Sequence, residues 1–203
     1  MRFFKLKFFI VTAIVCLLPV LIGISLWEKL PDTMAIHFNM YGEPDGFASK
    51  AFVVFALPLL MVILQAVCCV INDINAYKHG DRVKFVTVTK WIIPLLTVAL
   101  QIITFGYGLG LNFDVRKSVA VIVAILFLVI GNYIPKFDYI KNYDISSEKA
   151  RRINRFIGYE TVIMSLLFFI SIFLPPVATV VCIWLLIPYA VIGAVYGIAV
   201  GRK

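Results

Sequence analysis

Few side chains in this sequence have the chemistry of a catalytic or metal-binding residue, and they lie far apart. The two histidines are His37 and His79. His37 is followed by Glu43 and Asp45, and one imidazole with two carboxylates could bind a metal ion. These residues surround a strong turn signal and no further ligand completes a recognisable spacing. We therefore expect them to form loop structure and predict no metal site.

Catalytic motifs are missing as well. We find no Ser/His/Asp arrangement, no metal-ligand motif and no glycine-rich phosphate loop, and His79 stands alone in a charged connection. The rival interpretation is an intramembrane protease or a lipid-processing enzyme that uses Glu160 with His37. Those two residues fall on opposite sides of the membrane in the topology derived below. We predict that the protein is not an enzyme and needs no cofactor.

The four cysteines do not suggest a disulfide framework or a zinc site. They lie within or beside apolar runs, and no C-x-x-C motif occurs. We expect them to be buried thiols that pack between helices. The cysteines are Cys16, Cys68, Cys69 and Cys182.

The composition indicates what must position the few polar residues. Hydrophobic residues make up 62% of the 203 residues and charged residues 15%, with a mean hydropathy of +0.99. A soluble domain carries about 25% charged residues, so lipid must be the main solvent. The net charge of +8 is then explained by basic residues at cytoplasmic helix ends. We predict contact with membrane lipid and no binding of nucleic acid.

Six apolar stretches are long enough to cross a bilayer. The predicted fold is all-α, a polytopic bundle of six transmembrane helices. Four of the stretches contain a proline, which lipid-embedded helices tolerate as a kink. The stretches are Phe8–Trp27, Ala51–Ile71, Trp91–Leu111, Ser118–Ile134, Phe156–Leu174 and Val177–Val200, and the prolines are Pro19, Pro58, Pro94 and Pro188.

The distribution of basic residues predicts the orientation. Fifteen lysines and arginines fall in the two termini and in the second and fourth connections, against four in the other connections. By the positive-inside rule both termini are cytoplasmic. The first run is longer than the apolar part of a signal peptide, so we expect it to be retained rather than cleaved. We divide the chain into a helix pair at 1–71, with a structured extracellular loop at 28–50, and a four-helix region at 72–203, with a basic cytoplasmic loop at 135–155.

Polar and small residues inside the spans predict how the bundle is held. Gly193, Gly197 and Gly201 share one helix face and indicate a packing seam, whereas Gly106, Gly108 and Gly110 indicate an irregular helix end. Glu160 is the single acid within a predicted span, with Asn132 as a further polar residue near a span end. An ionisable group there is a functional candidate, but Glu160 could instead pair with a basic residue at the interface.

The extracellular loop is the most strongly patterned segment. Met34–Met40 predicts a short extended piece, and Gly42–Gly46 predicts a turn. We expect an ordered outer cap whose polar and aromatic side chains bind a partner; the alternative is that they only fold the loop. The candidate residues are His37, Phe38, Asn39, Tyr41, Asp45 and Lys50.

The basic cytoplasmic loop is the second candidate surface. Ser146 or Ser147 can begin a helix, and Glu148 can pair with Arg152 four residues on. The basic residues that follow either reach anionic headgroups or dock a cytoplasmic protein. They are Lys149, Arg151, Arg152 and Arg155.

The outer loop resembles the signature of the SdpI-type bacterial immunity proteins. That signature is roughly L-P-x-x-I-P-I-H-W-N-x-x-G-x-P-D-x-x-x-S-K, and the matching residues run from Leu30-Pro31 through Ile36–Asn39 and Gly42–Gly46 to Ala48–Lys50. Ile130–Asn132, Ser146–Glu148 and Asn154–Phe156 also resemble the family. Members carry an R-T-P-W-T-like run before the serine–glutamate segment, where this chain has Tyr139–Ile145.

The resemblance implies resistance to a secreted antimicrobial peptide toxin, which the protein would bind or block, and a cytoplasmic repressor held at the membrane. The rival is a transporter or transporter-associated subunit. Prolines in four spans and the glycine-rich third span favour a transporter. The absence of a clear inverted repeat and the few charges expected within the membrane oppose it.

Overall fold

The computed structural model describes residues 5–79, 83–136 and 147–202. Within these ranges helices dominate, and six of them are long and apolar enough to cross a membrane. The predicted all-α fold with six spans is confirmed, with one two-stranded sheet added to it. The spans are Leu6–Ser25, Phe52–Tyr77, Val86–Gly108, Val115–Lys136, Glu148–Ser171 and Pro176–Gly201. The chain forms two compact units, one of residues 1–78 and 86–119 and one of residues 79–85 and 120–203.

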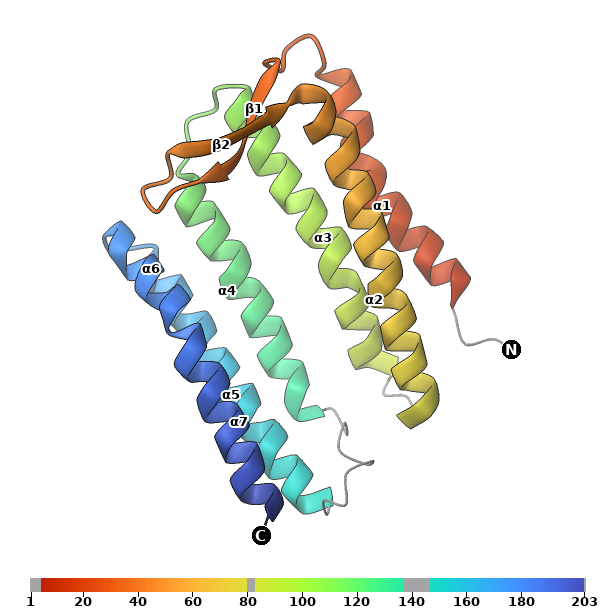
Figure 1. Ribbon diagram of the computed structural model, residues 1–203, viewed down its shortest axis with the longest axis vertical. Coiled ribbons are helices and arrows are strands. Elements are labelled where there is room, and N and C mark those ends of the chain that lie inside the picture. Colours follow the sequence, from red (N-terminus) through yellow and green to blue (C-terminus); the bar gives the residue numbers. More distant parts are fainter. Residues whose placement is uncertain (1–4, 80–82, 137–146, 203) are drawn as a thin grey trace. The chain divides into compact units, whose positions relative to one another are not determined.

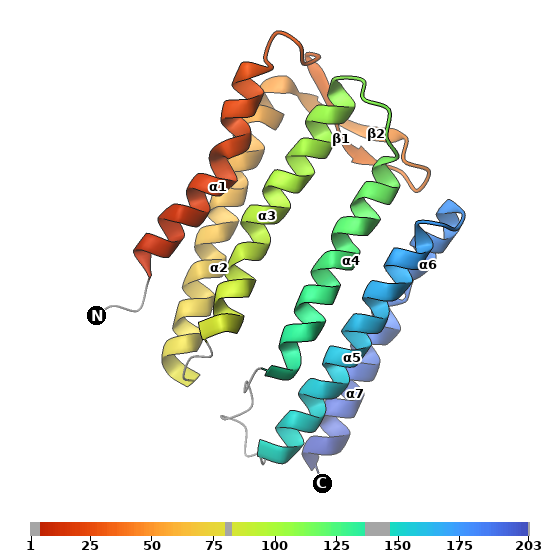
Figure 2. The same ribbon diagram turned by 180° about the vertical axis from the view of Figure 1, so that it is seen from behind.

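The first unit, here called the hairpin unit, consists of helices with a small sheet at one end (Figures 1 and 2). Its helices are α1 (Leu6–Ser25), the π-helix η1 (Phe52–Ala56), α2 (Leu57–His79), α3 (Val83–Gly108) and the first turn of α4 (Val115–Tyr133). The sheet joins the end of α1 to the start of η1 and is a hairpin of β1 (Thr33–Phe38) and β2 (Pro44–Ser49).

The two strands are antiparallel, with Thr33 opposite Ser49 and Phe38 opposite Pro44. The register shifts between Ala35 and His37 and again before Phe38, as at a β-bulge. The predicted extended piece is therefore present as β1. Strand β2 was not predicted, because Pro44, Asp45 and Gly46 are poor strand formers and only pairing with β1 holds them extended.

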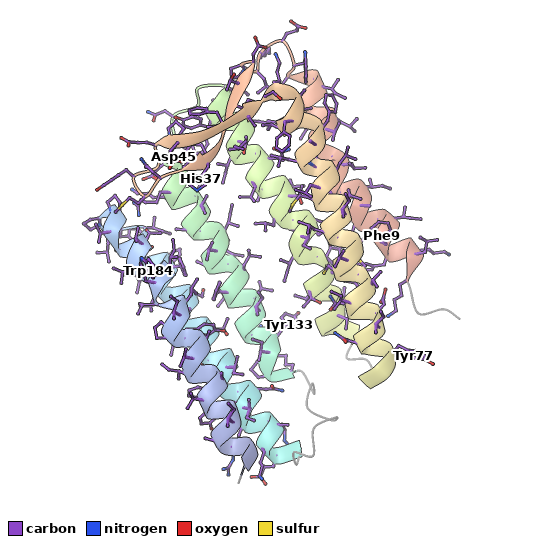
Figure 3. All side chains as sticks on the ribbon, viewed as in Figure 1. Phe9, His37, Asp45, Tyr77, Tyr133 and Trp184 are labelled. Atoms are coloured by element: carbon purple, nitrogen blue, oxygen red, sulfur yellow. The ribbon has the colours of Figure 1, made fainter. Side chains whose placement is uncertain are left out.

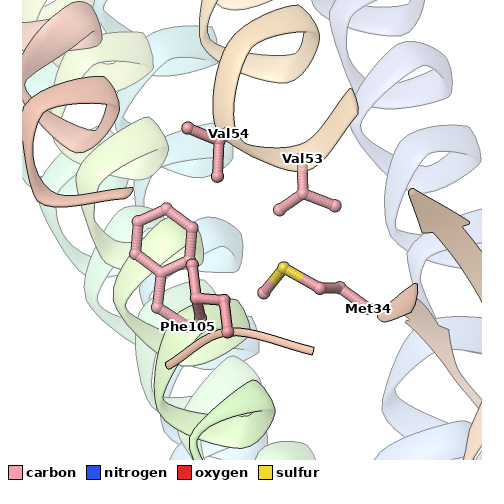
Figure 4. Close-up of a cluster of buried hydrophobic side chains, with 5 residues drawn as sticks. Met34, Val53, Val54 and Phe105 are labelled. Atoms are coloured by element: carbon pink, nitrogen blue, oxygen red, sulfur yellow. The ribbon is translucent and has the colours of Figure 1, made fainter. Parts of the chain in front are cut away.

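A hydrophobic cluster attaches the hairpin to the helices. Met34 of β1 packs with Val53 and Val54 of η1, Phe105 of α3 and Leu30 (Figure 4). A Cβ atom at Gly23 would lie 2.6 Å from a methyl group of Val54, so α1 approaches η1 at a residue without a side chain. Met34 is thus the buried anchor that fixes the hairpin on the bundle.

The start of the second span is irregular because of Pro58. A proline has no backbone N–H, so residue 58 cannot donate to Val54 in α-helical geometry or to Val53 in π-helical geometry. The chain adopts the wider π-helix η1, in which the Leu57 N–H donates to the Phe52 carbonyl. The side chain of Gln101 on α3 donates to the Val53 carbonyl at 2.8 Å. A neighbouring helix therefore satisfies a carbonyl that lacks an in-helix donor.

The second unit, here called the C-terminal unit, contains the rest of α4, the short 3-10 helix η2 (Ile134–Lys136), α5 (Ser147–Ser171), α6 (Pro176–Trp184) and α7 (Leu186–Arg202). A Cβ atom at Gly193 would lie 3.3 Å from Glu160 Oε2, and one at Gly197 would lie 3.9 Å from Ile153. The glycine face of α7 therefore packs on α5 at these two positions, as predicted for the seam.

A closer helix contact was not predicted. A Cβ atom at Gly131 of α4 would lie 2.9 Å from the Gly158 carbonyl oxygen, and one at Gly158 of α5 would lie 2.5 Å from the Pro135 ring. The two glycines come from different spans, so no repeat along the sequence marks them as partners.

Prolines distort the helices to different degrees. Pro19 and Pro94 lie inside the continuous helices α1 and α3. The last span is interrupted at Leu185, between α6 and α7. Pro188 cannot donate to the carbonyl of Trp184, which explains a break at this point, where only a kink was expected. The predicted irregular end of the third span is also present: α3 ends at Gly108, and Gly110 has a φ of 75°.

Candidate functional site

The turn of the hairpin is built around Asn39. Its side-chain oxygen accepts hydrogen bonds from the backbone N–H of Tyr41 at 2.9 Å and of Glu43 at 3.1 Å. Its side-chain nitrogen donates to Glu43 Oε2 at 3.0 Å. Gly42 has a φ of 83°, which glycine adopts without strain. Asn39 therefore holds the turn, as an asparagine side chain does when it substitutes for a backbone turn.

His37 and Asp45 form an exposed pair across the two strands. His37 Nδ1 lies 2.5 Å from Asp45 Oδ1, and both side chains are accessible to solvent. Figure 3 shows the two residues side by side on the hairpin. Among the described residues no group of three or more histidine, cysteine, aspartate or glutamate side chains has the arrangement of a metal site.

The predicted aromatic residues of the loop divide into two kinds. Phe38 packs edge-to-face on Tyr107 of α3, with ring centroids 4.9 Å apart. Tyr41 is 62% exposed, and Phe47 of β2 is 57% exposed. Phe38 therefore helps to attach the hairpin to α3, whereas Tyr41 and Phe47 present apolar surface outward.

Lys50 connects the end of the first span to the start of the second. Its ammonium group donates to the carbonyls of Trp27 and Leu30, each at 3.2 Å, and lies 3.0 Å from Asp32 Oδ1. It also lies 4.9 Å from the centre of the Trp27 ring. Only 14% of the side chain is exposed. Lys50 thus ties together backbone groups beyond the end of α1, a structural role on the buried side of the loop.

A second polar site lies inside the bundle, at the end of the hairpin unit away from the sheet. Lys90 of α3 and Asp73 of α2 form an ion pair, and the two residues are 1% and 3% exposed. Asp73 Oδ2 also accepts the backbone N–H of Lys5 at 3.1 Å. The Lys90 ammonium lies 5.3 Å from the centre of the Phe8 ring. The pair therefore joins α1, α2 and α3.

The ion pair belongs to a longer polar seam between these helices. Gln65 of α2 donates from Nε2 to Thr12 Oγ1 and to the Lys90 carbonyl, both at 2.9 Å. Gln65 is fully buried, and its Oε1 has no hydrogen-bond partner within the described residues. Further along the seam, Thr97 Oγ1 of α3 lies 3.9 Å from Cys16 Sγ of α1.

This site corrects the predicted bounds of the second and third spans, Ala51–Ile71 and Trp91–Leu111. Asp73 and Lys90 were placed in the second connection, and Glu160 was taken as the single acid within a span. The structure extends the second span to Tyr77 and begins the third at Val86, so both residues lie about one turn inside. The predicted spans stopped at these residues because hydropathy treats each charge by itself. Two opposite charges on neighbouring helices can neutralise each other and remain within the spans. The four-residue spacing of Gln65, Cys69 and Asp73, which places them on one helix face, was the available signal.

The two other intramembrane candidates, Glu160 and Asn132, belong to the C-terminal unit. Glu160 lies against Gly193 of α7. Its Oε2 is buried without a hydrogen-bond partner among the described residues, so the anticipated pairing with a basic residue is not seen for this oxygen. Asn132 is exposed and accepts a hydrogen bond from Lys136 Nζ at 3.3 Å.

The basic residues of the fourth connection lie at the beginning of α5. Arg151, Arg152 and Arg155 are exposed, and Lys149 is partly buried. The predicted pair of Glu148 with Arg152 is present at 3.4 Å. Ser146 and the Tyr139–Ile145 run, where the chain departs from the immunity-protein pattern, lie outside the described residues.

Comparison with known proteins identifies one related segment. A family model described as a domain of unknown function (DUF1648) matches residues 14–62. The match runs from within α1 through the hairpin and η1 into α2. No curated protein and no solved structure matches the chain. The matched segment contains every predicted residue of the outer loop and none of the Asp73–Lys90 pair.

Proposed function

We propose that this protein resides in the cell membrane and protects the cell against a secreted antimicrobial peptide, which it binds through the hairpin at the outer face. The observation that carries the proposal is that the longest connection on this side is a folded hairpin with exposed aromatic and ionic side chains. A connection that only joined two spans would need neither. The similarity of the loop to SdpI-type immunity proteins supports the same function. The proposed action is binding, without catalysis.

The contacts separate the residues that build the hairpin from those that could touch a peptide. Asn39, Phe38 and Lys50 make their contacts within the protein. Tyr41, Phe47 and the His37–Asp45 pair face solvent. In this proposal the first group sets the shape of the binding surface and the second group makes the contact.

The test is a protection assay in a toxin-sensitive bacterium that expresses the protein together with a candidate peptide from the same genomic neighbourhood. Wild type should raise the survival of the cells. Tyr41→Ala and Phe47→Ala should reduce protection at unchanged protein level in the membrane. Leu111→Ala is the matched control, since Leu111 is an exposed apolar residue outside the hairpin. If Tyr41→Ala and Phe47→Ala protect cells as well as wild type does, the proposal that the hairpin binds the peptide is wrong.

The regulatory part of the proposed function concerns the basic start of α5. Exposed Arg151, Arg152 and Arg155 suit either anionic headgroups or an acidic surface of a cytoplasmic repressor. Reversing the charge at Arg151 and Arg155 tests this part. Loss of a co-purified cytoplasmic protein, with toxin resistance retained, would support a docking role. Unchanged co-purification would contradict it.

Transport is the second candidate, and the buried Asp73–Lys90 pair is the observation that favours it. Charged residues inside membrane bundles often mark ion or substrate pathways. Purified protein in proteoliposomes should then move a labelled peptide across the bilayer, and Asp73→Asn should abolish that movement. Protection of cells by a protein that moves no peptide would favour binding at the outer face instead.

A further inference from the structure

The hairpin exposes apolar side chains where lipid tails do not cover them. The first span ends at Ser25 and the second begins at Phe52, so β1, β2 and their turn lie outside the membrane-spanning segments. Ile36, Tyr41 and Phe47 are nevertheless among the exposed large hydrophobic residues. Exposed apolar side chains within the spans are explained by lipid. Those of the hairpin are not explained by a span in lipid, and exposed aromatic side chains such as Tyr41 and Phe47 are candidates for contact with a partner.

Strand β2 sorts its side chains onto two faces. Pro44, Gly46 and Ala48 are partly buried, and Asp45, Phe47 and Ser49 alternate with them on the exposed face. The buried face is tight, since a Cβ atom at Gly46 would lie 2.8 Å from His37 Cβ. On the exposed face of β2, the aromatic ring of Phe47 is therefore two residues along the strand from the carboxylate of Asp45.

The charge of this face is opposite to that of the protein. The chain has a net charge of +8, yet the hairpin, residues 33–49, contains two acids, Glu43 and Asp45, and neither lysine nor arginine. The carboxylates of Glu43 and Asp45 face solvent at the turn and on β2. Anionic lipid headgroups are repelled by such a face, and basic groups are attracted to it.

We propose that the exposed face of the hairpin binds a cationic peptide that also carries apolar side chains. Apolar side chains of the peptide would cover Phe47 and Tyr41, and its basic groups would meet Asp45 and Glu43. This inference rests on the proposed function and adds to it the chemical class of the peptide. Aromatic rings supply binding energy with little loss of conformational freedom, while the carboxylates select against acidic peptides.

The experiment measures binding of two synthetic probes to the full-length protein in nanodiscs of phosphatidylcholine. One fluorescent peptide alternates lysine with leucine, and its counterpart of the same length alternates glutamate with leucine. Empty nanodiscs give the background from peptide bound to lipid. Fluorescence anisotropy should show that wild type binds the lysine peptide at least about tenfold more tightly than the glutamate peptide, and added salt should narrow the difference.

Variants locate the binding on the hairpin. Asp45→Asn and Glu43→Gln remove charge while they keep a hydrogen-bond acceptor for His37 and for Asn39, and each should weaken binding of the lysine peptide about two- to fivefold. Phe47→Ala should weaken the binding of both peptides. Glu28→Gln, which neutralises an exposed acid of the same loop before the hairpin, and Leu111→Ala should leave binding unchanged.

The protection assay on the same variants separates this inference from the proposed function. If wild type protects cells but binds both probes equally, binds neither, or binds the lysine peptide undiminished in Asp45→Asn and Glu43→Gln, the inference is wrong and the proposed function stands. If wild type protects against no peptide, the proposed function fails. A preference for the lysine peptide that the hairpin variants reduce would then still support the inferred peptide class.

Discussion

The Asp73–Lys90 pair shows how two charges can be kept within a membrane-spanning bundle. Removing either charge from water costs several kcal/mol, and their attraction repays that cost only when geometry and additional hydrogen bonds are good. Here the carboxylate has a second donor in the Lys5 N–H, and the ammonium lies against the face of Phe8. Each charge therefore depends on the other, and the three helices are joined at this point.

Mutation of one partner should be far more damaging than mutation of both. We expect Asp73→Ala or Lys90→Ala to destabilise the protein by about 3–5 kcal/mol, because the remaining charge is buried without its partner. The double variant Asp73→Ala with Lys90→Ala should lose much less stability than the sum of the two single changes, and the apolar replacement Asp73→Leu with Lys90→Met should be close to wild type. Thermal unfolding of the detergent-solubilised protein, followed by circular dichroism, measures the difference. Additive effects of the two changes would contradict a coupled pair.

Lys50 should contribute to stability rather than to binding. Lys50→Met retains the alkyl chain beside Trp27 and removes the donors to two carbonyls and to Asp32. We expect a loss of about 1–3 kcal/mol, because two partly buried carbonyls lose their donor, and a lower Tm in the same unfolding experiment. Lys29→Met replaces an exposed lysine of the same loop and should leave the Tm unchanged. A lower Tm of equal size in both variants would exclude the specific role of Lys50.

At the scale of the element, the hairpin unit depends on how neighbouring helices compensate for proline. Pro19 and Pro94 leave α1 and α3 continuous, whereas Pro58 is preceded by the π-helix η1 and Pro188 by the break at Leu185. The compensation at Pro58 comes from Gln101, which donates to the Val53 carbonyl. Because Val53 also belongs to the cluster that anchors Met34, this hydrogen bond supports the helix on which the hairpin is seated.

A double-mutant cycle tests this compensation. Gln101→Leu should cost about 1 kcal/mol, since it leaves the Val53 carbonyl unpaired within the bundle. In a Pro58→Ala background residue 58 regains its N–H, so Gln101→Leu should cost less. Unfolding midpoints of the four proteins give the coupling energy.

Thr104→Val is the matched control for this cycle. It removes a side-chain hydrogen bond to the Leu100 carbonyl on the same helix. Because that carbonyl lies within the regular part of α3, its loss should not depend on residue 58. An equal cost of Gln101→Leu in both backgrounds would show that Gln101 does not compensate for the missing donor.

At the scale of the whole molecule, the distribution of charge predicts which side of the membrane each connection occupies. By the predicted span bounds, fifteen of the nineteen basic residues lie in the termini and in the second and fourth connections. The structure places Lys90 inside the bundle, and it places Lys149, Arg151, Arg152 and Arg155 in the first turns of α5, next to the fourth connection. This distribution predicts that the hairpin lies outside the cell and the start of α5 inside. The proposed binding of a secreted peptide requires this orientation.

Site-specific labelling measures the orientation directly. With the four native cysteines replaced, Ser49→Cys should react with a membrane-impermeant maleimide in intact cells, and Ser147→Cys should react only after the cells are opened. Ser49 is exposed on β2, so the probe can reach it. Labelling of both cysteines from outside, or of Ser147→Cys alone, would overturn the topology and with it the proposed function.

The sequence by itself determined the features that depend on local composition. Apolar runs of sufficient length predicted six spans, because each span must bury its own backbone hydrogen bonds in lipid. The alternation of Met34–Met40 predicted one extended segment, since side-chain alternation is a local property. The turn predicted at Gly42–Gly46 is displaced: it lies at Asn39–Glu43, and Pro44–Gly46 belong to strand β2. The glycines of α7 predicted a packing seam because they are regularly spaced along one helix.

Only the tertiary structure decided which residues meet across elements. The Asp73–Lys90 pair, the Gln101–Val53 hydrogen bond and the contact of Gly131 with Gly158 each join residues from different helices. Each of these contacts needs a partner residue on another helix, and neither hydropathy nor local propensity identifies that partner. Strand β2 exists for the same reason, because residues with low strand propensity are held extended by pairing with β1. The roles of Lys50 and Tyr41, one buried and one exposed, likewise follow from what the surrounding helices cover.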